Sequence, residues 1–171
     1  PAENNLPYRE ASRINIHRDT WGTNLYQQIN WWAPVSNVEE KNTMIFYPDY
    51  FDVPVKNTTS TWDLNIYLAN RKKGDFSYPS APQLKEDLPS NIKKIPVTIK
   101  PGEILCFSGA HLHSSSKEKS ENTRISFEIR TICENDLNSS AQAPNVDCDL
   151  QWKFPKIFKK INDNSPLKIT S

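Results

Sequence analysis

Several features that would define other protein classes are scarce or missing in this chain. The cysteines are odd in number, with no CxxC spacing, which argues against both a disulfide framework and a structural zinc site; they are Cys106, Cys133 and Cys148. We therefore expect a reducing compartment and a cytoplasmic location. No apolar run is long enough to span a membrane, and no signal-peptide pattern is present. The net charge of +1, without a basic stripe, predicts no nucleic-acid or membrane partner.

What the chain does contain fits one domain, over residues 1–171. Only 36% of residues are apolar, but five Trp, six Tyr and seven Phe supply large buried areas. The first residue is Pro rather than Met, so we expect that an N-terminal portion of the natural protein precedes it.

Short alternating segments predict a mainly β fold with a few short helices, arranged as a sandwich or barrel. Thr61 predicts a cap for a short helix that ends near Arg71. Lys100-Pro101-Gly102-Glu103 predicts a tight turn joining two strands as a hairpin. The predicted strands are 13–19, 25–35, 43–47, the hairpin pair 95–99 and 104–107, and 123–132.

Two of the chain's three histidines and one carboxylate form the strongest chemical pattern. His17 and Asp19 have i, i+2 spacing on a predicted strand, so their side chains point to the same face. His113, or His111 with the same parity, can complete the set from a distant strand. Two imidazoles and one carboxylate suit Fe(II) with open coordination positions. The alternative is that an isolated histidine is simply a core or surface residue.

Arg124 and Ser126 follow on the last predicted strand, again with i, i+2 spacing. A guanidinium can bind a carboxylate through two parallel hydrogen bonds, and a nearby hydroxyl can donate another. Arg130 continues the same face and could meet an anionic substrate. The alternative is that these side chains only decorate a half-solvated strand.

Two segments, HRDTWGTNLYQQINWW and PGEILCFSGAHLHSSSKEKSENTRISFEIRT, resemble Fe(II)/2-oxoglutarate-dependent dioxygenases, most closely the phytanoyl-CoA dioxygenase-like branch. The resemblance covers residues 13–33 and 95–132. It implies a double-stranded β-helix (jelly-roll, cupin-like) fold and a hydroxylase that consumes 2-oxoglutarate and O₂ and releases succinate and CO₂. In that family an arginine follows the distal histidine by about eleven positions, and 124 − 113 = 11 selects His113 over His111.

Carried over by residue, the resemblance implies that His17, Asp19 and His113 are the catalytic iron ligands. It implies that Arg124 and Ser126 bind the 2-oxoglutarate carboxylate. Positions that often contact cosubstrate or substrate in the family correspond here to Gln28, Asn30 and Trp31.

Two other classes remain open from the sequence. One is a non-catalytic jelly-roll binding module, and the other is a cupin-like metalloenzyme that uses the same three ligands without 2-oxoglutarate. The spacing of Arg124 and Ser126 favours the oxygenase over both.

Overall fold

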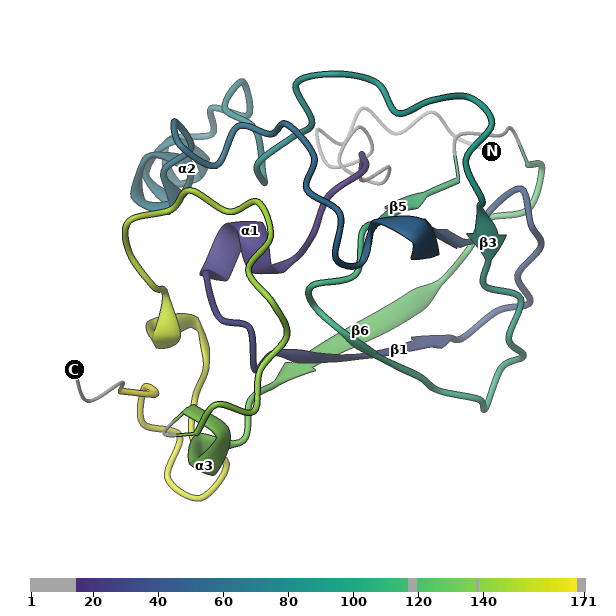
Figure 1. Cartoon of the computed structure of the whole chain (residues 1–171). Helices are drawn as coiled ribbons and strands as arrows, with labels where there is room; N and C mark the ends of the chain where they lie inside the picture. Colours follow the sequence, from purple (N-terminus) through teal and green to yellow (C-terminus); the bar gives the residue numbers. More distant parts are fainter. Residues whose placement is uncertain (1–14, 117–119, 138, 169–171) are drawn as a thin grey trace.

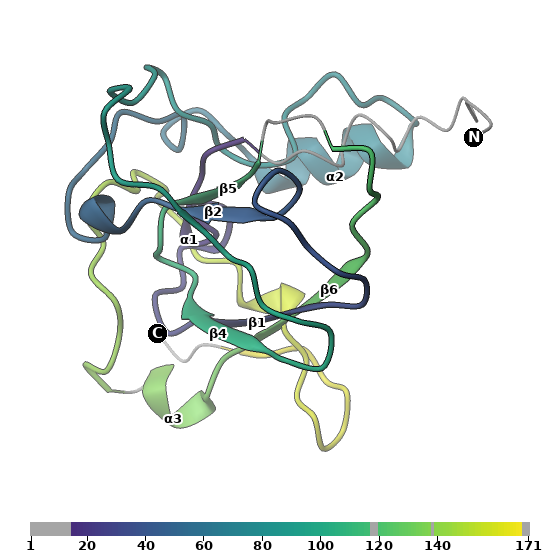
Figure 2. The same ribbon diagram turned by 90° about the vertical axis from the view of Figure 1, so that its right-hand side faces the viewer.

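The computed structural model describes residues 15–116, 120–137 and 139–168. Two three-stranded antiparallel sheets form its centre, in the orders β4-β1-β6 and β3-β2-β5. Figure 2 shows the two sheets as separate layers. The strands are β1 (Ile29–Pro34), β2 (Met44–Phe46), β3 (Ile95–Pro96), β4 (Leu105–Ser108), β5 (His113–Ser115) and β6 (Ser126–Thr131). The expected β-rich class with few helices is therefore confirmed.

The helices are short and lie outside the sheets (Figure 1). Asp63, not Thr61, caps the longest one, because its side chain accepts hydrogen bonds from the amides of Asn65 and Ile66. Within the described residues, no helix is long and apolar enough to cross a membrane. The helices are α1 (Thr20–Thr23), α2 (Leu64–Lys72) and α3 (Glu134–Leu137), with 3₁₀ turns η2 (Pro48–Tyr50) and η3 (Pro155–Ile157).

The predicted hairpin over 95–107 is wrong. Pro101 and Gly102 do make a turn, with Gly102 at a φ of 95° that suits glycine. However, β3 pairs with β2 in one sheet, whereas β4 pairs with β1 in the other. The chain therefore crosses between the layers at this turn.

Apolar side chains from both sheets fill one part of the space between the layers. Trp32, Met44, Val97 and Phe107 form this cluster. Strand alternation sets which side of β1 contributes, because Asn30 and Trp32 face inward and Trp31 faces outward. Polar residues of β6 occupy the adjoining part of the same interlayer space, and there a pocket forms.

Candidate metal centre

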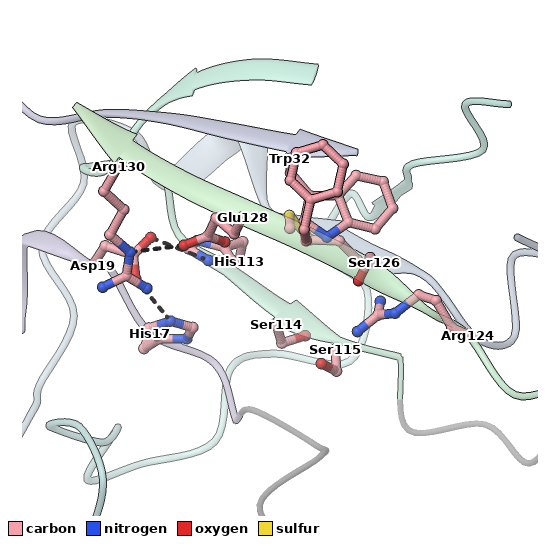
Figure 3. Close-up of a pocket in the computed structure, with 12 residues that line it drawn as sticks. His17, Asp19, Trp32, His113, Ser114, Ser115, Arg124, Ser126, Glu128 and Arg130 are labelled. Carbon is pink, nitrogen blue, oxygen red and sulfur yellow. Dashed lines mark hydrogen bonds and ion pairs between the residues drawn. The ribbon is translucent and has the colours of Figure 1, made fainter. Parts of the chain in front are cut away.

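The three predicted ligand residues converge. His17, Asp19 and His113 are all buried, and one ligand atom from each lies within 4.8 Å of the others. Nε2 of His17 lies 3.4 Å from Asp19 Oδ1, and Nε2 of His113 lies 3.6 Å from Asp19 Oδ2 (Figure 3). Two imidazoles and one carboxylate at this separation fit a divalent transition-metal ion.

Backbone pairing brings the two histidines together. His17 and His113 exchange two hydrogen bonds, of 2.9 and 3.0 Å, in an isolated antiparallel bridge at the start of β5. The predicted strand over 13–19 is otherwise wrong within the described residues, because the chain turns into α1 at Thr20; Arg13 and Ile14 lie outside them. His17 and Asp19 still face the same point, while the buried Arg18 binds backbone carbonyls and Asp147 instead.

Both histidine rings are held in the tautomer that a metal needs. Nδ1 of His17 lies 2.8 Å from the carbonyl of Asn15, and Nδ1 of His113 lies 2.9 Å from that of His111. A carbonyl can only accept a hydrogen bond, so Nδ1 carries the proton in each ring. Nε2 of each ring is the nitrogen that faces Asp19 and can bind a metal.

Burial and neighbouring charges keep His113 and Asp19 in the protonation states that a metal ion needs at neutral pH. Burial lowers the pKa of His113 to about 4, so its ring is neutral. Burial alone would raise the pKa of Asp19, but its polar neighbours His17 and His113 and the positive charge of Arg130 lower it overall. The carboxylate is therefore ionised and can bind a cation.

A buried chain of side-chain hydrogen bonds orients Asp19. Asn30 Nδ2 donates to Asp19 Oδ2, and Gln28 Nε2 donates to Asn30 Oδ1 at 2.8 Å. The hydroxyl of Thr23 donates to Gln28 Oε1 at 3.2 Å. Gln28 and Asn30 are 0% exposed, so this relay is sealed from solvent.

The relay changes the roles expected for three residues. Gln28 and Asn30 do not line the pocket and act on the site only through Asp19. Trp31 lies on the opposite face of β1, where it is 40% exposed and its indole N–H donates to Thr131. Strand alternation explains the difference, because Trp31 has the opposite parity from Asn30 and Trp32. A direct cosubstrate contact is therefore not supported for any of the three.

A pocket of about 180 Å³ extends from the three ligand residues. This is well below the roughly 300–1,000 Å³ typical of pockets for drug-sized ligands, so the pocket suits a ligand smaller than these. His17, Asp19, His113 and Arg130 lie at one end, and Arg124 lies at the other (Figure 3). The predicted residues Arg124 and Ser126 thus share one cavity with the candidate metal ligands.

Arg124 presents a hydrogen-bonding group that the described part of the chain leaves unsatisfied. Its Nη1 is buried, and no atom of the described residues accepts a hydrogen bond from it. Its guanidinium carbon lies 5.7 Å from the centre of the Trp32 ring. Burial lowers the pKa of Arg124, but an arginine remains charged. A buried, charged donor that lines a cavity fits an anionic ligand.

Arg130 and Glu128 belong to the site in ways that the sequence did not predict: Arg130 was expected only to meet a substrate, and Glu128 was not predicted. Nη2 of Arg130 lies 2.9 Å from Asp19 Oδ1, and its Nε lies 2.7 Å from Glu128 Oε1. Period-2 alternation along β6 could have found Glu128, which lies between Ser126 and Arg130 on one face. Ser114 and Ser115 also line the pocket, and no sequence signal pointed to them.

His111 lies apart from the candidate ligands. Its ring packs 4.6 Å from that of Phe51, and its Nδ1 lies 3.1 Å from the carbonyl of Ser108. It is not part of the cluster of potential ligands. The geometry therefore agrees with the choice of His113 made from its spacing to Arg124.

Neither protein-family models nor curated protein sequences match this chain. The function is consequently inferred from the geometry and chemistry of the pocket.

Proposed function

We propose that this protein is an Fe(II)- and 2-oxoglutarate-dependent oxygenase that hydroxylates a small-molecule substrate in the cytoplasm, with release of succinate and CO₂. The observation that carries the proposal is one pocket that holds both His17/Asp19/His113 and the unsatisfied Arg124 donor. The two three-stranded sheets would then be the centre of a double-stranded β-helix. The sequence resemblance to the phytanoyl-CoA dioxygenase-like branch points the same way.

The donor set fits the metal and the cosubstrate. Two imidazoles and an ionised carboxylate would hold iron, and Arg124 with Ser126 would bind the distal carboxylate of a five-carbon diacid. Bound Fe(II) and 2-oxoglutarate would supply the oxidising chemistry. The protein's own part is to orient Asp19 through Asn30, to aim both Nε2 atoms at the metal position through the Nδ1 hydrogen bonds, and to bury the ligand end.

The direct test is an anaerobic Fe(II) titration with and without 2-oxoglutarate. We expect a weak visible charge-transfer band that needs both components, and succinate formation on admitting O₂ with a substrate. A metal that binds without any effect of 2-oxoglutarate would favour the cupin-like alternative. Absence of metal binding would favour the non-catalytic module.

Matched histidine variants assign the ligands in the same assay. His113→Ala should abolish tight Fe(II) binding, and so should Asp19→Ala. His111→Ala should leave Fe(II) affinity near the wild-type value, because that ring packs on Phe51. The reverse result for the two histidines would reject this ligand assignment.

A further inference from the structure

Arg130 holds an unusual position for a cation, directly on the carboxylate that we propose as a metal ligand. It lies opposite Asn30 in the register of β6 with β1, so both side chains point inward toward Asp19. Arg130 contacts Oδ1, whereas Asn30 donates to Oδ2. Arg130 is therefore the cation in direct contact with the carboxylate that an incoming metal ion would bind.

The contacts of Arg130 also distinguish it from a buried structural arginine. Its side chain is 40% exposed, whereas that of Asp19 is 3% exposed. It lines the pocket, and its second partner, Glu128, lies on the same strand two residues away. The guanidinium can thus shift toward the cavity while it keeps Glu128.

Charge balance gives the reason for such a shift. Asp19 and Glu128 carry two negative charges, and Arg124 and Arg130 carry two positive charges, so the four side chains sum to zero. A divalent ion on Asp19 raises this sum to +2 and repels the guanidinium that touches the same carboxylate. Nη2 of Arg130 then loses its partner beside the metal, where only an anion can restore the balance.

We propose that Arg130 is a second carboxylate-binding residue, which the metal releases from Asp19 and which then selects an anionic group at the metal end of the pocket. This inference rests on the proposed function. The carboxylate belongs either to the metal-proximal end of 2-oxoglutarate or to the primary substrate. Binding is consequently ordered, with the metal before the carboxylate.

The test measures Co(II) affinity and carboxylate affinity separately by calorimetry and visible absorption, without turnover. Arg130→Gln removes the charge, Arg130→Lys keeps the charge but lacks the planar fork, and Arg71→Gln on α2 is the control for loss of an arginine elsewhere. Because a cation competing for the Asp19 carboxylate is gone, Arg130→Gln should bind Co(II) at least about threefold more tightly. Arg130→Lys and Arg71→Gln should stay near the wild-type Co(II) affinity.

Carboxylate binding should move in the opposite direction. On the Co(II)-loaded protein, Arg130→Gln and Arg130→Lys should weaken a carboxylate about three- to tenfold. A loss of 2-oxoglutarate affinity identifies the cosubstrate as the source. Unchanged 2-oxoglutarate affinity, with loss of the spectral response to acetate added to the saturated complex, identifies the primary substrate.

Two results overturn the inference: Co(II) affinity that is unchanged or lower in Arg130→Gln, or carboxylate probes that bind this variant as they bind wild type. A wild-type Co(II) protein that fails to bind 2-oxoglutarate contradicts the proposed function instead. In that case the Co(II) and acetate measurements still decide the role of Arg130.

Discussion

Gly109→Ala should lower the stability of the protein and weaken metal binding, although Gly109 has no side chain that contacts the metal position. A Cβ atom at this position would lie 2.9 Å from Gln28 Nε2, 3.2 Å from Gln28 Cδ and 3.5 Å from Asp19 Cβ. Optimal carbon contacts are roughly 3.5–4.0 Å, so the first two contacts are repulsive. Neither side can retreat easily: the Gly109 amide donates to the carbonyl of Gln28, its carbonyl accepts from Thr20, and Gln28 is 0% exposed.

The expected loss of stability follows from overpacking the buried hydrogen-bond chain that supports Asp19. Inserting a methyl group into a close-packed interior costs about 1–3 kcal/mol, and loss of the hydrogen bond from Gln28 to Asn30 adds about 1 kcal/mol. We therefore expect the free energy of unfolding to fall by about 2–4 kcal/mol in urea denaturation. Displacement of the relay should also weaken metal binding, because Asn30 orients Asp19.

Gly22 provides the matched control, because a Cβ there meets nothing within 4 Å. Gly22→Ala in α1 should be neutral or stabilise by up to about 1 kcal/mol. The double variant Gly109→Ala/Gln28→Ala removes the clashing amide, so its loss should be smaller than the sum of the two single losses. Equal stability of Gly109→Ala and Gly22→Ala would refute the relay as a rigid support.

Three further predictions concern the ligands and their supports. Arg124→Lys should weaken 2-oxoglutarate about ten- to a hundredfold in equilibrium binding while Fe(II) affinity changes little, with a smaller loss for Ser126→Ala; equal losses for metal and cosubstrate would contradict this. Asn30→Leu should leave one oxygen of buried Asp19 without its donor and lower Co(II) affinity, whereas in an Asp19→Ala background the same change should have no further effect on Co(II) binding. Between about pH 6.5 and pH 4 the unfolded chain binds more protons at His113 than the folded protein, whose pKa there is about 4. Acidification in chelator should therefore lower the free energy of unfolding by at most about 3 kcal/mol over this range, and His113→Gln should flatten that slope.

The parts of the site with local periodicity were predictable from the sequence. The alternation of Arg124, Ser126 and Arg130 predicts one shared face, and all three line the pocket, with Arg124 just before the start of β6. His17 and Asp19 converge although the predicted strand between them does not form. Alternation predicts which residues share a face, and His17 and Asp19 keep that shared direction although the chain turns into α1 directly after them.

Long-range pairing was the part that local patterns could not supply. The turn at Pro101-Gly102 is visible in the sequence, but the separation of β3 and β4 into two sheets depends on the strands that compete to pair with them. The roles of Gln28 and Asn30 likewise depend on Asp19, nine or more positions away, and on the backbone of Gly109. Burial of an amide and its partners is a tertiary property.

The pocket side of β6 has a consequence for how this protein can change. The candidate metal ligands lie on two other segments, at His17/Asp19 and at the start of β5, whereas the chain from 124 to 130 supplies Arg124, Ser126, Glu128 and Arg130 to the pocket. Under the proposed function, replacing alternate residues of this one segment would therefore change which small molecule the pocket binds, while His17, Asp19 and His113 stay in place. The same arrangement is vulnerable to a one-residue deletion within β6, which would turn the side chains on one side of the deletion outward together. Under the proposed function, libraries that vary these positions at constant length are accordingly the direct route to altered substrate selectivity.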